Sequence, residues 1–277
     1  MLVYLMIILL ISNTPPDIFE DPEITSIKSG FENGEFILKA YIGRQIVYIA
    51  RGSEEGGEAE GIWTIYGFED IVSAKETDLP QKRIASGRCI GGKRDGEWKG
   101  FFDNEKVAWE GEYRDGLLTG VYTDYFETGQ IRFQGSYNNG FKCGHWKYYH
   151  ENGHVQVEGD YDNDLRTGVW SVYYPSEAKL WQCSYKIISD KEKGMYSVRD
   201  GEFKMYHKGG QLAQHGSYIQ GNKEGKWIYF NHKGIKVIEG SFMKSKKEGG
   251  WIYYNTKGKK SRQIFFEKGK KIKEIDF

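Results

Sequence analysis

The sequence predicts an all-β fold: an elongated single antiparallel sheet made of tandem β-hairpin repeats of about 24 residues. Three observations lead to this prediction. The sequence repeats itself, fixed positions of the repeat hold aromatic residues and glycine, and no segment keeps a helical apolar stripe for three turns. The composition agrees, because 16% of the 277 residues are aromatic and 36 are glycine, whereas only 5 are proline. A chain of this length can bury a sizeable core.

Residues 1–16 form an apolar N-terminal segment. Its run "LVYLMIILLI", Leu2 to Ile11, is about half as long as a membrane-spanning helix. The run has the length of the apolar part of a signal peptide, although no Lys or Arg precedes it. Export to the periplasm or cell surface and a cytoplasmic location both fit this segment.

Residues 17–60 are predicted to form a degenerate repeat or N-terminal cap. Their stretch "FENGEFILKA" (Phe31 to Ala40) aligns with "FETGQIRFQG" (Phe126 to Gly135), which belongs to a clear repeat. We therefore expect a worn hairpin to precede the regular ones.

Residues 61–277 contain eight clear repeats. With the first glycine as position one, the repeats begin at Gly61, Gly96, Gly120, Gly144, Gly168, Gly201, Gly225 and Gly249. Most steps are 24 residues, but the first is 35 and the fifth is 33. We expect an insertion of eleven residues near "SAKETDLPQKR" and one of nine within "KIISDKEKGMYSVRD", Lys186 to Asp200.

Each repeat is predicted to be one hairpin. Positions two to seven suit a strand, a short turn such as "ENG" or "HKG" follows, and positions eleven to eighteen form the return strand. Glycine recurs at positions ten and sixteen, for example Gly153 and Gly159. A lone hairpin is marginally stable in water, so neighbouring hairpins must pair their edges and pack their aromatic side chains together.

Aromatic residues occupy positions three and six of every repeat. We single out the structural aromatics Trp98, Tyr125, Trp146, Tyr149, Trp170, Tyr173, Trp227 and Trp251. Truncating a Trp buried between repeats would cost about 3–5 kcal/mol, whereas an exposed row of rings could bind sugars or bases by stacking. Packing is favoured because every repeat carries these rings. Strand alternation places positions three and six on opposite faces, unless a bulge brings both rings to one side.

Charge is distributed unevenly along the chain. The totals cancel, with 39 basic and 39 acidic residues, so net charge gives no argument for nucleic acid or membrane. Residues 1–80 carry 14 acidic against 5 basic residues, and residues 221–277 carry 15 basic against 6 acidic residues. The basic end could bind an anionic partner through Lys244, Lys246, Lys247, Lys259, Lys260, Lys270 and Lys271. The alternative is that both ends are solvated surfaces.

The sequence offers little for catalysis, and we expect no enzyme activity, cofactor or metal. His150 and His154 could meet across a turn as metal ligands, but surface positions near turns commonly tolerate histidine. Three cysteines, Cys89, Cys143 and Cys183, are too few and too scattered for a disulfide framework or a zinc knuckle.

The repeat resembles the MORN-repeat variant. Its pattern is glycine-x-Trp-x-x-Tyr, a turn with Asn-Gly, then Glu-Gly-x-Tyr, and clean examples are "GHWKYYHENGHVQVEGDY" and "GKWIYFNHKGIKVIEGSF". The resemblance covers Gly61 to Phe277. The chain departs from the pattern where Glu177 and Ala178 replace the turn glycine and where Cys183 and Ile264 replace the second glycine. The fifth and eighth repeats are therefore expected to be less regular.

Chains made of this repeat alone are similar to the bacterial YwqK-family antitoxins, and this resemblance implies a protein partner, a toxin that the chain neutralises. We expect a non-enzymatic protein–protein interaction repeat protein with no nucleic-acid partner. The alternative is a peripheral membrane scaffold that uses the basic C-terminal end. An extended repeat surface suits protein binding, because affinity accumulates over its area without a pocket.

Overall fold

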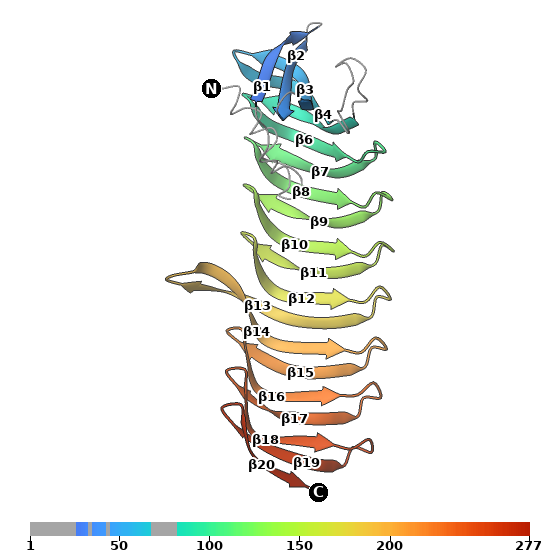
Figure 1. Ribbon diagram of the computed structural model, residues 1–277, viewed down its shortest axis with the longest axis vertical. Helices are drawn as coiled ribbons and strands as arrows, with labels where there is room; N and C mark the ends of the chain where they lie inside the picture. The colour runs from blue at the N-terminus through green and yellow to red at the C-terminus, as the bar shows by residue number, and fades with distance from the viewer. Residues whose placement is uncertain (1–25, 33–34, 43–44, 68–81) are drawn as a thin grey trace. The chain divides into compact units, whose positions relative to one another are not determined.

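The computed structural model describes residues 26–32, 35–42, 45–67 and 82–277. The apolar segment 1–16 and residues 73–81 of the first insertion lie outside these described residues. The chain divides into two compact units, an N-terminal unit (Met1–Phe141) and a C-terminal unit (Lys142–Phe277). Every regular element in the described ranges is a β-strand (Figure 1). The predicted all-β fold of tandem antiparallel hairpins is confirmed, and the described residues include no helix that could cross a membrane.

The strands of each unit follow one another along the chain. Those of the N-terminal unit are β1 (Ser26–Glu32), β2 (Glu35–Ile42), β3 (Gln45–Glu55), β4 (Glu58–Gly67), β5 (Lys82–Ile90), β6 (Lys93–Phe101), β7 (Val107–Arg114), β8 (Leu117–Tyr125) and β9 (Ile131–Asn138). Those of the C-terminal unit are β10 (Phe141–Tyr149), β11 (Val155–Asp162), β12 (Leu165–Tyr173), β13 (Lys179–Asp190), β14 (Gly194–Tyr206), β15 (Leu212–Ile219), β16 (Asn222–Phe230), β17 (Lys236–Met243), β18 (Lys246–Tyr254), β19 (Lys260–Glu267) and β20 (Lys270–Asp276).

The turn inside the repeat that begins at Gly225 is closed by one of its own side chains and by glycine. Between β16 and β17, the Asn231 carboxamide oxygen accepts hydrogen bonds from the backbone N–H groups of Lys233 (2.9 Å) and Ile235 (3.0 Å). Gly234 follows with φ of 75° and donates its N–H to the Asn231 carbonyl at 2.9 Å. In the fifth repeat Glu177 adopts the same left-handed conformation, with φ of 66°, so the turn survives without its glycine.

The two aromatic positions lie on opposite faces of the sheet. In β12, Trp170 at position three is fully buried on the face that we call the aromatic face. Tyr173 at position six lies on the other face, called the polar face, where its hydroxyl donates to the Glu158 carboxylate of β11 at 2.6 Å. Tyr125 donates to Glu110 in the same way at 2.6 Å. Simple strand alternation therefore holds, and both faces carry aromatic side chains.

Most of the buried tryptophans lie flat against a glycine of the preceding strand. A Cβ built on Gly240 of β17 would lie closer than 3.0 Å to the Trp251 indole of β18, and Gly216 stands in the same relation to Trp227. The Trp251 Nε1–H also donates to the Ser241 backbone carbonyl at 3.1 Å, next to that glycine. Glycine at position sixteen is therefore needed because an indole of the next repeat occupies the space of its side chain.

The two departures at position sixteen follow from this contact. Cys183 of β13 pairs with Phe203 of the neighbouring strand β14. Phe203 is the third position of its repeat, where the other repeats have tryptophan or tyrosine. A smaller ring leaves room for a thiol. Ile264 of β19 pairs with Glu274 of β20, so no indole lies over it. Where no large ring follows, the glycine is not required.

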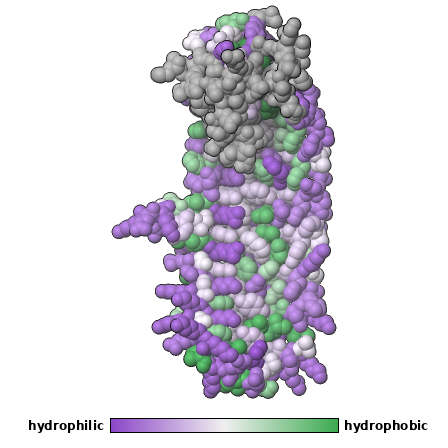
Figure 2. All heavy atoms as spheres, in the orientation of Figure 1, coloured by the Kyte–Doolittle hydropathy of each residue, from purple (hydrophilic) through white to green (hydrophobic). Residues whose placement is uncertain are grey.

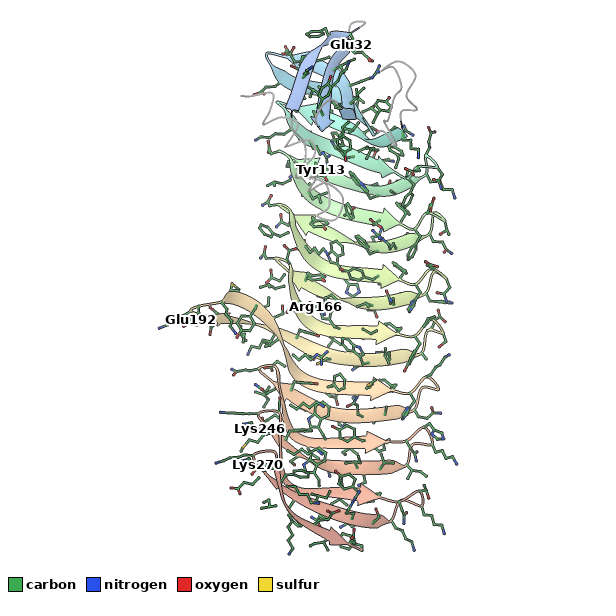
Figure 3. The ribbon with its side chains drawn as sticks, viewed as in Figure 1. Glu32, Tyr113, Arg166, Glu192, Lys246 and Lys270 are labelled. Atoms are coloured by element: carbon green, nitrogen blue, oxygen red, sulfur yellow. The ribbon has the colours of Figure 1, made fainter. Side chains whose placement is uncertain are left out.

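The insertion between Lys186 and Asp200 lengthens a hairpin. The β13–β14 pair continues past Tyr185 and Arg199 until Asp190 pairs with Gly194. This extension projects from the stacked hairpins of the C-terminal unit in Figure 1. Figure 3 shows Glu192 at its tip. The inserted residues extend an existing ladder of hydrogen bonds, so they leave the neighbouring repeats in register.

We predict that Gly240→Ala destabilises the protein by about 2 kcal/mol or more, because the new methyl group must displace the Trp251 ring. Ser241→Ala, at the exposed neighbouring position, should change stability by less than about 0.5 kcal/mol. The measurement is the free energy of unfolding from urea denaturation.

The same contact predicts the sign of a double-mutant cycle. Gly240→Ala should cost less in a Trp251→Phe background than in the native background, as the Cys183–Phe203 pair suggests. Strictly additive changes in unfolding free energy would show that the indole is not what excludes a side chain at position 240.

Candidate binding surface

A row of basic side chains covers the buried rings of the C-terminal unit. The residue two positions before each repeat glycine is basic, and its charged group lies over the ring at position three. The distances from charged group to ring centre are 4.6 Å for Lys142 and Trp146, 4.5 Å for Arg166 and Trp170, 5.8 Å for Arg199 and Phe203, 4.1 Å for Lys223 and Trp227, and 4.4 Å for Lys247 and Trp251. We call Lys142, Arg166, Arg199, Lys223 and Lys247 the cation row.

Strand register places each of these cations. Lys223 of β16 pairs with Tyr218 of β15, so both side chains point to the aromatic face. Two residues later in the same strand the pairing shifts around Gly225, which has φ of 64°, and Trp227 lies on the same face as Lys223. The Lys223 ammonium therefore reaches both its own indole and the ring of Phe242 at 5.2 Å.

The row forms a charged cover over an apolar layer. Trp146, Trp170 and Trp227 have no exposed surface, and Trp251 is 2% exposed. Above them Lys223 and Lys247 are half-buried, and Arg166 is exposed. Figure 3 labels Arg166 on β12. A cation held over a ring gains roughly 0.5–1 kcal/mol at a partly exposed site, yet it keeps its full charge.

The aromatic face carries no acidic residue from β10 to β19, all strands within the described ranges. Carboxylates of these strands lie on the polar face, where Glu202 pairs with Lys204 at 2.7 Å and Glu239 pairs with Lys226 at 2.9 Å. On the aromatic face, burial and the nearby Arg199 guanidinium lower the pKa of Lys223. Charge is therefore segregated by face, and the aromatic face of these strands is purely cationic.

The aromatic face of the N-terminal unit is different. Its one equivalent basic residue, Arg94, is buried and donates to the Tyr113 hydroxyl at 3.1 Å. The next repeat has Leu118 at this position. Asp124 lies on the same face, where Arg132 binds it at 2.6 Å. The described part of this unit therefore lacks a row of exposed cations on its aromatic face.

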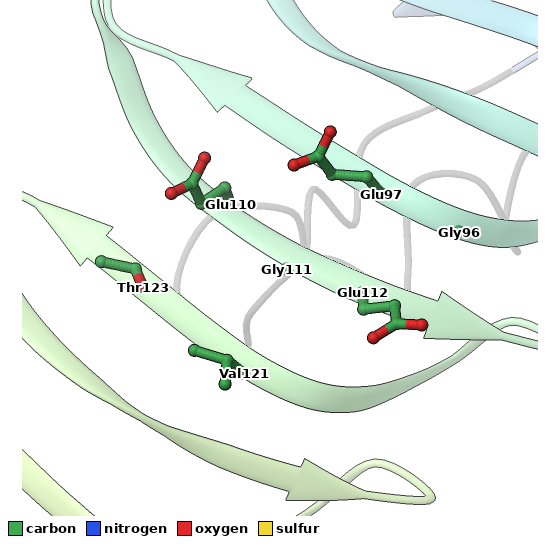
Figure 4. Close-up of a pocket in the computed structure, with 7 residues that line it drawn as sticks. All are labelled: Gly96, Glu97, Glu110, Gly111, Glu112, Val121 and Thr123. Atoms are coloured by element: carbon green, nitrogen blue, oxygen red, sulfur yellow. The ribbon is translucent and has the colours of Figure 1, made fainter.

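The polar face of the N-terminal unit holds an acidic hollow of about 440 Å³ (Figure 4). It is lined by Gly96, Glu97, Glu110, Gly111, Glu112, Val121 and Thr123. The Lys99 ammonium lies 3.5 Å from Glu97 and 3.4 Å from Glu110. Burial opposes the charged form of Lys99, but these two carboxylates outweigh it and raise its pKa. One ammonium group therefore compensates part of the negative charge that the three carboxylates Glu97, Glu110 and Glu112 bring to the hollow.

The seven lysines singled out from the sequence do not form one cluster. Lys246 and Lys270 lie at the same lateral edge (Figure 3), and a Cβ on Gly269 would lie 3.6 Å from Lys246 Cβ. Lys244 and Lys271 belong to the turns and strand ends of this edge. Lys259 and Lys260 follow the turn at the other end of β18. Lys247 belongs to the cation row.

Figure 2 shows hydrophilic residues along both lateral edges of the C-terminal unit. Sequence reasoning grouped these lysines because they are close in the chain. It missed Lys142, Arg166, Arg199 and Lys223, although a basic residue two positions before the repeat glycine was visible in the alignment of repeats.

The tryptophans singled out from the sequence are buried, and the tyrosines Tyr125, Tyr149 and Tyr173 are half-buried. The two histidines considered as metal ligands have different partners. His150 Nε2 lies 3.1 Å from the Tyr173 carbonyl, and His154 Nδ1 lies 2.7 Å from Glu177. Among the described residues, no three His, Cys, Asp or Glu side chains are grouped as metal ligands.

The stacked hairpins and their repeated rings define an all-β repeat protein. Three of its segments, residues 118–139, 142–163 and 199–220, match the MORN repeat variant. Repeats of this kind indicate a repeat-based binding protein. No curated protein matches the chain.

Solved structures show only weak likeness. TarM is 14% identical with a TM-score of 0.28, over 49% of this chain and 25% of that chain. The Photorhabdus luminescens Tc holotoxin pore is 8% identical with a TM-score of 0.18, over 87% of this chain and 18% of that chain. A porin-like protein from Bacteroides uniformis is 8% identical with a TM-score of 0.16, over 90% and 92%. The chain thus spans about a quarter of the length of TarM.

We predict that two of the three thiols are unreactive in the native protein. Burial raises the pKa of Cys89 to about 12 and that of Cys183 to about 11, so neither forms the thiolate at pH 8. Titration with a thiol reagent should modify one residue, Cys143, before unfolding and all three in guanidinium. In Cys143→Ser the native-state reaction should disappear. Fast reaction of two thiols in the native protein would contradict this account.

We predict that Glu239 stabilises the protein in a pH-dependent way. Burial opposes its charged form, but hydrogen bonds from Tyr254, Lys226 and Lys236 outweigh burial and hold its pKa at about 2. A carboxylate with a lowered pKa stabilises the native state above its ordinary pKa of 4.5, and this contribution is lost as the pH falls toward 2.

Thermal unfolding at several pH values tests the stabilisation by the Glu239 carboxylate. Glu239→Gln should lower Tm by a few degrees at pH 7, and the difference from the native protein should shrink between pH 4.5 and pH 3. The exposed Glu267→Gln serves as the control and should change Tm little at either pH. A difference for Glu239→Gln that is the same at pH 3 and pH 7 would show that the carboxylate charge is not responsible.

Proposed function

We propose that this chain is a non-enzymatic binding protein whose partner is another protein with an acidic contact surface. The observation that carries the proposal is the purely cationic aromatic face of β10–β19. Segregated charge of one sign attracts and orients a partner of the opposite sign. The five cations recur once per repeat, so the attraction is distributed over many strands, which favours an extended contact over a pocket.

The partner class that best fits the resemblance to YwqK-family antitoxins is a toxin. In this proposal the chain binds the toxin along the aromatic face and blocks it by covering its surface. Affinity then depends on contact area and complementary charge, and no chemical step is needed. The antitoxin role rests on the resemblance, and the acidic contact surface rests on the cation row.

A second candidate is attachment to an anionic membrane through the lysine-rich edge. Lys244, Lys246 and Lys270 gather at one edge of the C-terminal unit, and each basic residue near an anionic surface contributes roughly 1 kcal/mol. In this case Lys244→Gln combined with Lys246→Gln and Lys270→Gln should abolish co-sedimentation with phosphatidylserine vesicles. The same variant should keep a protein partner that is bound by the cation row.

Affinity capture followed by pairwise binding tests the proposal. The tagged protein is used to capture partners from its own host, and the partner identified by mass spectrometry is then purified. A variant carrying Lys142→Gln, Lys223→Gln and Lys247→Gln should bind this partner at least about tenfold more weakly than the native protein, since three charge contacts are lost. For the antitoxin role, co-expression of the native chain should restore growth of cells that express the partner.

A matched control removes the same charge from the turns. Lys208→Gln, Lys233→Gln and Lys257→Gln change three exposed lysines and should leave binding within about twofold. Equal binding of the partner by the native protein and the cation-row variant would refute the proposed site. Capture of no protein with an acidic surface would refute the proposed function.

A further inference from the structure

We propose that the cation row holds an extended acidic peptide segment with an acidic residue at every third position, running along the stacked hairpins. This inference rests on the proposed function, and it specifies the part of the partner that contacts the row. It is drawn from the spacing of the row, from the accessible groups beside it and from the burial of the rings beneath it.

The spacing of the row matches an extended peptide. Its members lie on β10, β12, β14, β16 and β18, which are alternate strands. Adjacent strands are about 4.8 Å apart, so successive cations are about 9.6 Å apart. Three residues of a polyproline II segment rise about 9.3 Å, and three residues of a β-strand rise about 10 Å. One carboxylate per three residues therefore meets one cation per repeat.

The cations are held in place before a ligand arrives. Lys247 lies 4.4 Å from Trp251 and 4.9 Å from Phe266, so two rings fix one ammonium group. Arg166 is held between Trp170 at 4.5 Å and Tyr185 at 5.8 Å. A side chain that is already ordered loses less entropy when it forms an ion pair. The rings carry no net charge, so they leave the positive charge of each cation uncompensated.

The residues between the cations suit the other two positions of the peptide unit. Position five of each repeat shares the aromatic face with the row and is half-buried. These residues are Tyr148, Val172, Met205, Tyr229 and Tyr253. They offer apolar area beside each cation, which can contact the proline or aliphatic side chains that separate successive acidic residues.

Burial of the tryptophans favours a peptide over a single-stranded nucleic acid. Proteins that bind single strands without sequence preference use exposed aromatic side chains on which the bases stack. Trp146, Trp170 and Trp227 have no exposed surface. A ligand on this face can therefore contact the cations of the row but not the faces of the indole rings. What remains accessible is regularly spaced positive charge with apolar side chains between, and an extended acidic peptide complements both.

Synthetic peptides test the inference with the full chain. The probe is a fluorescein-labelled peptide of five Glu-Ala-Pro units, which disfavours helix and favours polyproline II. The matched control has the same composition with its five glutamates placed together at one end. Fluorescence anisotropy at low salt should give an affinity at least about fivefold higher for the spaced peptide. Raising the salt to about 0.5 M should weaken binding, because the charge contacts are partly exposed.

Variants locate the site. Lys223→Gln and Lys247→Gln should each weaken binding of the spaced peptide about two- to fivefold, and Lys142→Gln added to both should bring the loss to about tenfold or more. Lys208→Gln, Lys233→Gln and Lys257→Gln together should leave it within about twofold. Far-ultraviolet circular dichroism and Tm of each variant confirm folding. Arg166→Lys keeps the charge and should keep most of the affinity if the row acts through charge.

Three results would overturn the inference: equal affinity for the spaced and the clustered peptide, an equal loss in the turn-lysine variant, or tighter binding of a fifteen-nucleotide oligo-dT or a hyaluronan oligosaccharide than of the spaced peptide. The outcome is separable from that of the proposed function. A captured partner that depends on the row while the spaced peptide fails to bind refutes only the extended-segment inference. Binding of the spaced peptide with no captured protein partner refutes only the proposed function.

Discussion

The contact on which the fold depends is that of an indole lying flat on a glycine of the strand before it. Trp227 on Gly216 and Trp251 on Gly240 place one large apolar ring at each junction between repeats. A hairpin on its own cannot bury such a ring, since both of its faces are open to water. The ring is buried only when the next hairpin pairs with the first, and this couples strand pairing to burial.

The cation row follows from the same contact. Among the described residues, each unit consists of hairpins joined in one sheet, with no second layer over the aromatic face. The side of each indole that points away from the sheet would therefore be exposed to water unless another side chain covered it. The aliphatic stem of Lys or Arg, two positions before the repeat glycine, supplies that cover, and its charged end lies over the ring. In the repeat that begins at Gly120 the ring is Tyr122 and Leu118 takes the place of the base. The leucine side chain is close to Gly111, beside this ring. Packing and the proposed partner binding therefore use the same side chains in the C-terminal unit.

Most of the fold could be predicted from the sequence because the period and the turn residues are local signals. Glycine at positions ten and sixteen, aromatic residues at three and six, and the length of the second insertion all correspond to features of the strands and turns. The reason for glycine at position sixteen could not be predicted, since it depends on Trp251 approaching Gly240 from a strand whose register the sequence does not state.

The candidate surface was predicted less well. Lysines near the C-terminus, such as Lys246 and Lys259, were predicted to form a binding site because they are close together in the sequence. The cation row is spread over more than 100 residues, from Lys142 to Lys247, and becomes a row only when alternate strands are brought side by side. The face on which a residue lies, and whether a carboxylate shares that face, are properties of strand register. Composition and net charge average over both faces and so conceal such a surface.

The pairing of Cys183 with Phe203 shows where one module of this protein ends and the next begins. Cys183 and Phe203 belong to consecutive hairpins. The segment that must stay intact for this contact therefore runs from the second strand of one hairpin to the first strand of the next. Duplication or loss of a repeat is tolerated when the cut falls in the turn within a hairpin. At this junction, a cut between the hairpins would join a thiol to an indole, or a glycine to a ring too small to fill the space. The Cys183–Phe203 junction therefore limits which repeats can be duplicated or lost beside it.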